Sequence, residues 1–256
     1  PGADSSTDIA DLTGNAITVI AIKPTISVAI NDGGDGRLNA SEASSVAISG
    51  TTSGAEDDQT VSLNISSSAG GTPINTTATI TSNSYSATGL DLSSLNDGTL
   101  TITADVDDLA GNAATQASDT STKDSSSPTI AISSDVASLK TGETATLTFT
   151  LSEASSNFAE SDVTVSGGTL SNWSAASSTS YSATFTQTAD NTTDGVISVA
   201  SSKFSDSAGN TNNDGSDSNN SVTLSVNSGI NTDVDRENNT DVNPKINPPS
   251  VFNEFI

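Results

Sequence analysis

The sequence predicts an all-β fold made of two tandem immunoglobulin-like β-sandwiches with Greek-key connections. Three observations support this prediction. Apolar residues alternate with polar ones at period two, and turn-forming Gly, Asn and Asp residues separate the alternating segments. Short motifs also recur after about one hundred residues, the usual size of one immunoglobulin-like domain.

Two repeated motifs divide the chain into modules. Pro-Thr-Ile occurs at residues 24–26 and 128–130, and Asp-x-x-Gly-Asn occurs at residues 11–15, 108–112 and 206–210. Each module therefore begins with Pro-Thr-Ile and nears its end at Asp-x-x-Gly-Asn. We expect a first module at residues 23–124 and a second at residues 125–228. Residues 1–22 read as the end of a preceding module, and residues 229–256 as an irregular C-terminal tail or assembly segment.

The alternating segments locate the strands. Each has apolar residues at every second position, which gives one buried and one solvated face. The clearest are residues 60–66, 99–106, 145–151, 162–167, 181–186, 195–201 and 221–226. In the first module we also expect an initial strand at residues 25–30 and a second near residues 46–49. Tyr85 and Tyr181 each open a Tyr-Ser-Ala-Thr phrase, and we expect both to anchor a core.

Composition limits the kinds of function. The chain has 31 acidic and 7 basic residues, a net charge of -24, and neither histidine nor cysteine. Such a charge repels nucleic acid and anionic membrane surfaces and attracts cations. Disulfides, thiolate nucleophiles and zinc sites built from Cys or His are excluded. The longest apolar run, residues 16–22, is too short for a membrane helix. The first residues do not resemble a signal peptide, so we interpret the chain as a mature or internal segment.

Residues 31–42, NDGGDGRLNASE, partly match the calcium-binding loop of an EF-hand. Matching positions are held by Asn31, Asp35, Gly36, Leu38, Asn39 and Glu42. However, Gly33 offers no side-chain ligand at the third position, and no helices are predicted on either side. Two interpretations stay open, a loop that contacts calcium and a solvated acidic turn.

A second calcium site is predicted where the two modules meet. In a Greek-key sandwich the A–B loop lies at the downstream end, and the B–C and F–G loops lie at the upstream end. The A–B loop of the first module should therefore face the linker and two loops of the second. The acidic and amide residues expected there are Asp32, Asp35, Asn39, Glu42, Asp124, Glu153 and Asp206. Carboxylates so close together repel unless a cation joins them, and calcium accepts six to eight oxygen ligands in loose geometry.

Each Asp-x-x-Gly-Asn segment is predicted to form an Asx turn with its glycine in the left-handed conformation. The acids of these turns, Asp107 and Asp108 in the first module and Asp206 in the second, are also candidate calcium ligands. The pentapeptide Ser-Glu-Ala-Ser-Ser occurs twice, around Glu42 and around Glu153. Our strand assignment places these two glutamates in different loops.

Longer phrases resemble a known family. Residues 36–65 and 85–115 look like the Ig-like repeat of very large bacterial surface adhesins of the biofilm-associated and RTX types. Residues 127–210 resemble a sister type of bacterial Ig-like repeat. The resemblance covers nearly all of residues 23–226 and departs at the tail, which does not begin another module. It implies a calcium-dependent protein that is extracellular or located on the bacterial cell surface.

The leading interpretation is a set of calcium-stiffened spacer modules of an extracellular bacterial adhesin or surface fibre, whose partners are neighbouring Ig-like modules of the same chain. One alternative is a subunit of an ordered assembly with like subunits, such as an S-layer, a filament or a phage tail decoration. Another is a module that binds a glycan or host protein, with Trp173 as a stacking platform. Trp173 also fits a core or sheet-face position. The lysines lie in no nucleophile motif, and we expect no enzymatic activity, no nucleic-acid binding and no membrane insertion.

Overall fold

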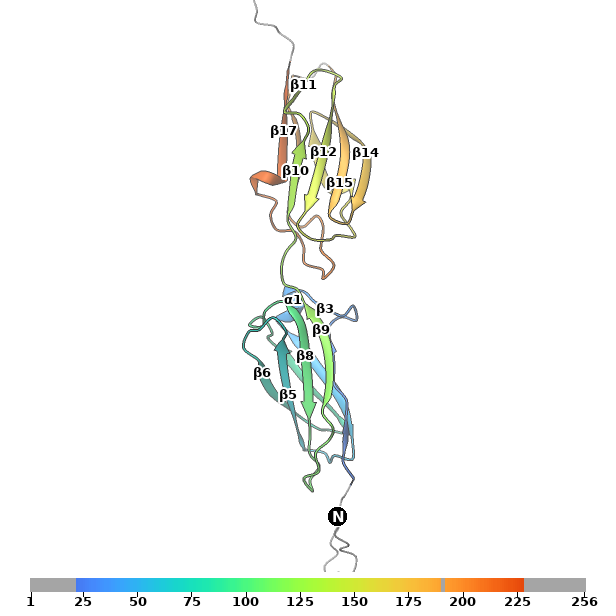
Figure 1. Ribbon diagram of the computed structural model, residues 1–256, viewed down its shortest axis with the longest axis vertical. Helices are drawn as coiled ribbons and strands as arrows, with labels where there is room; N and C mark the ends of the chain where they lie inside the picture. The colour runs from blue at the N-terminus through green and yellow to red at the C-terminus, as the bar shows by residue number, and fades with distance from the viewer. Residues whose placement is uncertain (1–21, 190–191, 228–256) are drawn as a thin grey trace, which may run out of the picture.

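The protein is described by a computed structural model that covers residues 22–189 and 192–227. These residues form two β-sandwiches stacked end to end, with the first module below the second (Figure 1). The predicted all-β fold is confirmed. The expectations for residues 1–22 and 229–256 fall, except for Ile22, outside the described residues. No helix within the described ranges is long and apolar enough to cross a lipid bilayer.

The first module pairs a four-stranded sheet with a five-stranded one. The first sheet consists of β1 (Thr25–Ile26), β2 (Ala29–Asn31), β4 (Val46–Ser53) and β7 (Ser84–Leu90). In it β4 pairs on one side with β1 and β2, the two halves of the initial strand, and on the other side with β7. The second has the order β3-β9-β8-β5-β6, formed by β3 (Arg37–Leu38), β9 (Ala117–Lys123), β8 (Gly98–Asp105), β5 (Thr60–Ser67) and β6 (Ile74–Thr79). Each sheet turns one face towards the other.

The second module has two four-stranded sheets. One has the order β10-β12-β15-β14, formed by β10 (Ile130–Ser134), β12 (Thr144–Leu151), β15 (Ser180–Gln187) and β14 (Gly168–Ser177). The other has the order β11-β17-β16-β13, formed by β11 (Ser138–Leu139), β17 (Ser221–Val226), β16 (Gly195–Val199) and β13 (Val163–Ser166). These orders are those of an immunoglobulin-like Greek key. Two 3-10 turns, η2 (Glu160–Asp162) and η3 (Ser218–Asn220), precede β13 and β17.

The modules differ in where the fourth strand pairs. In the first module six residues separate β5 from β6, enough for a hairpin, and the two strands pair antiparallel. In the second module Gly167 alone separates β13 from β14, so no hairpin can form and β14 joins the opposite sheet beside β15. Gly167 has φ +74, and a Cβ there would lie 2.5 Å from the Asp194 carbonyl oxygen. A side chain at this corner would therefore clash with the backbone.

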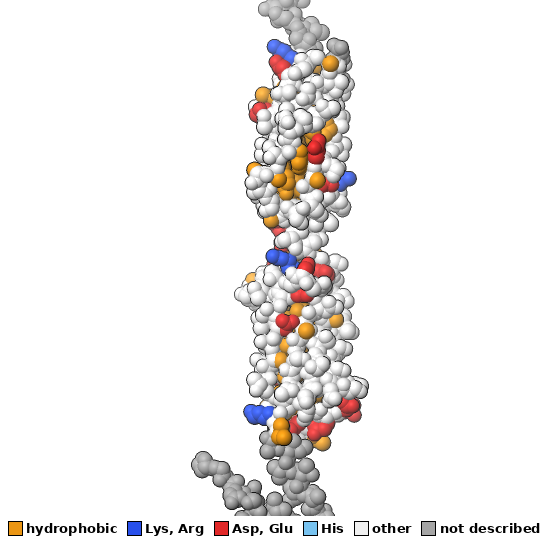
Figure 2. Space-filling view, turned by 90° about the vertical axis from the view of Figure 1, so that its right-hand side faces the viewer, with side chains coloured by type: hydrophobic (Ala, Val, Ile, Leu, Met, Phe, Trp, Pro, Cys, Tyr) orange, Lys and Arg blue, Asp and Glu red, His pale blue; other side chains and the backbone are white. Residues whose placement is uncertain are grey.

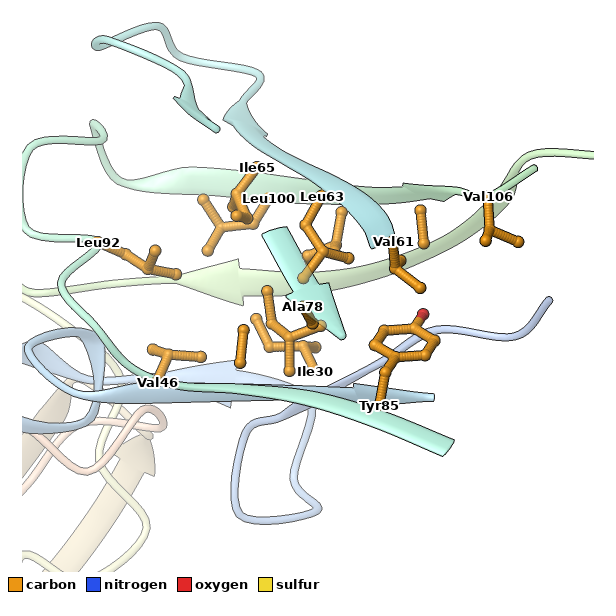
Figure 3. Packing of buried hydrophobic residues seen from close by; sticks show 14 of the residues in the cluster. Ile30, Val46, Val61, Leu63, Ile65, Ala78, Tyr85, Leu92, Leu100 and Val106 are labelled. Atoms are coloured by element: carbon orange, nitrogen blue, oxygen red, sulfur yellow. The ribbon is translucent and has the colours of Figure 1, made fainter. Parts of the chain in front are cut away.

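Each module has its own hydrophobic core, built from the alternating positions of its strands. Figure 3 shows side chains from both sheets of the first module meeting between them. In that core Val61, Leu63 and Ile65 alternate along β5, and Leu100 and Ile102 alternate along β8. Burying an aliphatic side chain of this size contributes about 1.5–3 kcal/mol. Separate cores mean that each sandwich buries its own apolar face.

Tyr85 and Tyr181 lie in the cores, as predicted. The Tyr85 hydroxyl donates to the Ser27 carbonyl oxygen at 2.6 Å, which ties β7 to the start of the module. Gly50 makes this contact possible, because a Cβ at that position would lie 2.0 Å from the Ser27 oxygen and 2.5 Å from the Tyr85 hydroxyl. The Tyr181 hydroxyl donates to the Ser155 carbonyl oxygen at 3.1 Å. Each tyrosine thus has an apolar body in the core and a satisfied polar end.

One short helix was not expected. Residues 40–43 form α1 (Ala40–Ala43) at the downstream end of the first module, next to the linker (Figure 1). Asn39 caps it, since its Oδ1 accepts hydrogen bonds from the backbone N–H groups of Ser41 and Glu42. The Glu42 carboxylate in turn accepts from the Asn39 N–H at 3.0 Å, which completes a capping box. The sequence pattern Asn-x-x-Glu was the signal for this helix.

Candidate cation site at the junction between the modules

The linker leaves the first module beside an ion pair whose lysine is buried. Lys123, the last residue of β9, has a side chain that is 3% exposed, and its Nζ lies 2.7 Å from Asp97 Oδ1. The same carboxylate accepts from the Ser125 N–H at 2.9 Å and from its hydroxyl at 2.8 Å. Burial alone would raise the pKa of Asp97, but the hydrogen bonds from Lys123 and Ser125, with the charge of Lys123, hold that pKa below its ordinary value. The first residues of the linker are therefore held against the first module.

Three carboxylates meet just beyond this ion pair. Asp124 lies in the linker, Glu153 in the loop after β12, and Asp206 in the loop between β16 and β17. One oxygen from each lies within 4.8 Å of the other two. Asp206 is buried and the other two are half-buried. Within the described ranges, this is the one such group of acidic side chains. Of the candidate ligands, the structure brings these three together.

The Asp-x-x-Gly-Asn turn orients Asp206. Its Oδ1 accepts from the N–H groups of Ala208 at 2.8 Å and Asn210 at 2.9 Å, and its Oδ2 accepts from Asn210 Nδ2 at 2.9 Å. Gly209 has φ +92, the left-handed conformation that glycine adopts without strain. The predicted Asx turn is confirmed, and it leads from β16 back towards β17. The carboxylate is thereby held in place before any ligand binds.

The group of three is electrostatically unfavourable when all its members are ionised. Burial raises the pKa of Glu153, and the charges of Asp124, Asp206 and Asp97 raise it further. Among the described residues, the one ion pair joins Lys123 to Asp97, and none involves Asp124, Glu153 or Asp206. A proton on Glu153 or a cation between the three oxygens would relieve the repulsion. The oxygen-only donor set suits a hard cation such as calcium.

The acidic loop at residues 31–37 does not join this group. Asp32 Oδ1 accepts from the Gly34 N–H at 3.1 Å, and Asp35 Oδ1 accepts from the Arg37 N–H at 2.9 Å, so both carboxylates support turns of their own loop. Asn39 and Glu42 use their oxygens to cap α1. The structure therefore places Asp32, Asp35 and Glu42 outside the group formed by Asp124, Glu153 and Asp206. The loop is short enough to close on itself through local hydrogen bonds.

Asp107 and Asp108 lie at the opposite, upstream end of the first module, where Figure 2 shows acidic side chains gathered. Asp108 is 3% exposed and repeats the turn seen at Asp206, since it accepts from the N–H and Nδ2 of Asn112, each at 2.8 Å. These hydrogen bonds lower the pKa of Asp108. Asp107 is exposed beside it. Neither residue belongs to the junction group.

The repeated pentapeptide occupies different structures, as predicted. Glu42 lies in α1 before β4, whereas Glu153 lies in the loop after β12. Trp173, on β14, is half-buried and packs against the second core. Its ring centroid lies 5.2 Å from that of Phe149, 5.5 Å from Phe158 and 5.8 Å from Tyr181. These contacts place it at the sheet face of the core.

Sequence reasoning did not identify the residues that support the junction. Asp97 and Lys123 lie in no motif, and their pairing depends on β9 ending beside the loop that precedes β8. Asn210 belongs to the repeated turn, but its side chain also reaches the first module. The Ala40 N–H donates to Asn210 Oδ1 at 2.9 Å. In the sequence, the position of Asn210 at the end of the Asp-x-x-Gly-Asn motif was the signal that could have identified it.

Several solved structures are similar to the chain. Among solved structures, the chain is similar to a tetra-tandem repeat in the extending region of a large adhesion protein, with 25% identity and a TM-score of 0.36, over 79% of this chain and 48% of that one. It is also similar to invasin, a bacterial integrin-binding protein, with 16% identity and a TM-score of 0.31, over 80% of this chain and 39% of that one. The chain thus spans less than half the length of either.

No curated protein matches the chain. A family model described as the bacterial Ig-like domain matches residues 124–242, which include all strands of the second sandwich. The strand orders of that sandwich are those of the immunoglobulin-like fold. The second module is therefore similar to the bacterial Ig-like domain.

Proposed function

We propose that the chain is a spacer segment of an extracellular bacterial adhesin or surface fibre, and that calcium stiffens the junction between its two modules. The observation that carries the proposal is the meeting of Asp124, Glu153 and Asp206 at the point where the chain crosses from one sandwich to the next. The match of the second module to the family model of the bacterial Ig-like domain supports the spacer role. We assign the chain no catalytic role.

The three acids suit this task because they come from two sides of the junction. Asp124 is fixed to the first module, since its N–H donates to the Leu38 carbonyl oxygen at 3.0 Å. Glu153 and Asp206 belong to loops of the second module. A cation bound to all three would tie the linker to the second module and restrict rotation about it. Backbone oxygens and water would supply the remaining ligands that calcium requires.

The expected affinity is that of extracellular calcium modules, with a dissociation constant of about 0.1–1 mM. At about 10 mM calcium, a site of that affinity stabilises the folded state by about 1.4–2.7 kcal/mol. The second module should therefore melt several degrees higher in calcium than in chelator. Calcium should also narrow the range of angles between the modules.

The test is a calcium titration followed by differential scanning calorimetry and small-angle scattering. Glu153→Gln and Asp124→Asn should each abolish most of the calcium-dependent rise in melting temperature. Asp32→Asn is the matched control, because it removes one charge while its side-chain oxygen can still accept from Gly34. It should respond to calcium as the parent does. Parent scans that superimpose with and without calcium would contradict the calcium site.

Scattering tests the mechanical part of the proposal. The parent should give a longer and narrower particle in calcium than in chelator, and Asp124→Ala should lose this difference while each module stays folded. A calcium-bound parent that is as flexible as the chelated one would contradict stiffening, even if calcium binds.

A further inference from the structure

Asn210 joins three parts of the molecule. Its side-chain Oδ1 accepts from the Ala40 N–H of the first module at 2.9 Å. Its Nδ2 donates to the Asp124 carbonyl oxygen of the linker at 2.8 Å and to Asp206 Oδ2 of its own turn at 2.9 Å. Asn210 is 6% exposed. One buried amide therefore bonds to the first module, the linker and the second module at once.

The orientation of this amide is fixed by its partners. Ala40 N–H can only donate, while the Asp124 carbonyl and the Asp206 carboxylate can only accept. Rotating the amide by 180° would point its NH2 group at the Ala40 N–H. It would also point its oxygen at the oxygens of Asp124 and Asp206. All the hydrogen-bonding groups are neutral except the Asp206 carboxylate, and Asp206 is itself held by its turn.

Ala40 has a particular reason to need this partner. The first N–H groups of a helix have no partner within it. In α1 the Asn39 side chain accepts from Ser41 and Glu42, and the Asn39 carbonyl oxygen accepts from Ala43. The Ala40 N–H is the one left, and Asn210 of the next module accepts it. Gly209 allows the approach, because a Cβ there would lie 3.3 Å from Asn39 Nδ2.

The corresponding turn at the downstream end of the second module is built differently. Where the first module has α1, the second has a turn between β11 and β12 at residues 140–143. In that turn Glu143 Oε2 accepts the Lys140 N–H at 2.9 Å, and the Glu143 N–H donates to the Lys140 carbonyl oxygen at 3.0 Å. The contact made by Asn210 therefore depends on a feature of the first module.

We infer that Asn210 is a metal-independent latch, which seats the second module on the capped start of α1 by accepting the Ala40 N–H. The inference goes beyond the proposed calcium site, because none of its three hydrogen bonds requires a cation. The latch sets the relative position of the modules, whereas bound calcium would restrict the motion that remains.

The sharpest test removes the donor without touching the second module. Ala40→Pro deletes the N–H that Asn210 accepts, and proline suits the first position of a helix. Asn39 already has φ −74 and ψ 178, the extended conformation favoured before proline. Helix α1 and its cap should therefore survive. Asn210→Ala removes the latch from the other side, and Asn112→Ala removes the corresponding amide from the turn at the far end of the first module.

The distance between modules is the direct readout. The chain contains no cysteine, so the exposed positions Thr77→Cys and Ser171→Cys can carry one spin label in each module. In chelator, the parent should give a narrow distance distribution by double electron–electron resonance. Ala40→Pro and Asn210→Ala should both broaden it, and the double variant should be no broader than Asn210→Ala alone. Asn112→Ala should keep the parent width.

Two results would overturn the latch. The first is a parent distribution in chelator as broad as those of the variants. The second is broadening by Asn210→Ala without broadening by Ala40→Pro, which would assign the effect to the loss of support for Asp206. Because every measurement is made without calcium, failure of the latch and failure of the calcium proposal are distinguishable.

Discussion

Replacing Asp97 by asparagine should strongly destabilise the first module. The substitution leaves the Lys123 ammonium group, 3% exposed, without the carboxylate that lies 2.7 Å from it. Asparagine retains an oxygen that can accept from Ser125, so the main loss is the charge. An ammonium group that stays buried without a counter-charge is costly, because protein atoms solvate it far less well than water does.

The size of the effect follows from how deeply each partner is buried. Removing one partner of a buried ion pair costs about 3–5 kcal/mol. The Asp97 side chain is 33% exposed, and water that reaches the site screens part of the loss, so we expect the lower end, about 3 kcal/mol. For a domain of this size that loss lowers the melting temperature by about 12–24 °C.

Calorimetry of the full chain measures the change, with Asp105→Asn as the matched control. Asp105 is exposed and accepts from Gln116 Nε2 at 2.8 Å, so its neutralisation should shift the melting temperature by only a few degrees. The double variant Asp97→Asn with Lys123→Met should recover much of the loss, since it no longer buries an unpaired charge.

The pH dependence gives an independent check. The folded protein holds the pKa of Asp97 below its ordinary value of 3.8. Its stabilisation is therefore complete above that pH and is lost as pH falls through the lower, folded-state pKa. The Asp97→Asn variant should lack this acid-dependent loss. A decrease of less than about 4 °C for Asp97→Asn at neutral pH would refute the reasoning, because it would correspond to an ordinary surface pair.

Three further substitutions test the cores and the junction. Tyr85→Phe loses the 2.6 Å hydrogen bond to Ser27 and should cost about 1–3 kcal/mol in chemical denaturation. Burial raises the pKa of Tyr85 from 10.0 to about 12, so the parent alone should lose this group's stabilisation as pH rises from 10.0 through about 12. Gly50→Ala should destabilise the first module by about 1–3 kcal/mol or more, because the added Cβ would overlap the Ser27 oxygen. An unchanged unfolding midpoint would show that the strands can move apart without penalty. In chelator Glu153→Gln should stabilise the protein above pH 4.5. The pKa of Glu153 is raised in the folded protein, so the parent loses stability as pH rises beyond that value. Equal pH profiles of stability for the two proteins would contradict the repulsion.

The strands and the Asp-x-x-Gly-Asn turns could be predicted because both are encoded locally. Alternation along residues 60–66 and 145–151 marks a buried face whatever the pairing, and the structure has β5 and β12 there. The turn at Asp206 is closed by the side chain and backbone of residues four positions apart. Such features need no knowledge of distant parts of the chain.

The junction could be predicted only in part. Greek-key topology correctly brings Asp124, Glu153 and Asp206 together, because it assigns whole loops to one end of a sandwich. It does not say which way a side chain within a loop points. Asp32 and Asp35 were therefore expected at the junction, whereas backbone N–H groups of their own loop hold them.

The support for the junction depends on registers that the sequence does not specify. Lys123 meets Asp97 because Lys123 pairs with Gly98 in the ladder between β8 and β9. A shift of one residue would turn the lysine to the other face of the sheet. Asn210 likewise meets Ala40 only because α1 begins where it does, and a four-residue helix leaves almost no periodic signal.

The two proposals assign different physical roles to neighbouring residues. The hydrogen bonds of Asn210 to Ala40 and to the Asp124 carbonyl join neutral groups, so they should depend little on salt or calcium. The carboxylates of Asp124, Glu153 and Asp206 repel one another without a cation, and this repulsion acts directly beside the latch. At low calcium this repulsion should therefore strain the hydrogen bonds of Asn210, and at high calcium bound cation should remove the repulsion. Asn210→Ala should consequently widen the inter-module distance distribution more in chelator than in calcium, whereas additive effects would show that the latch and the acids act independently.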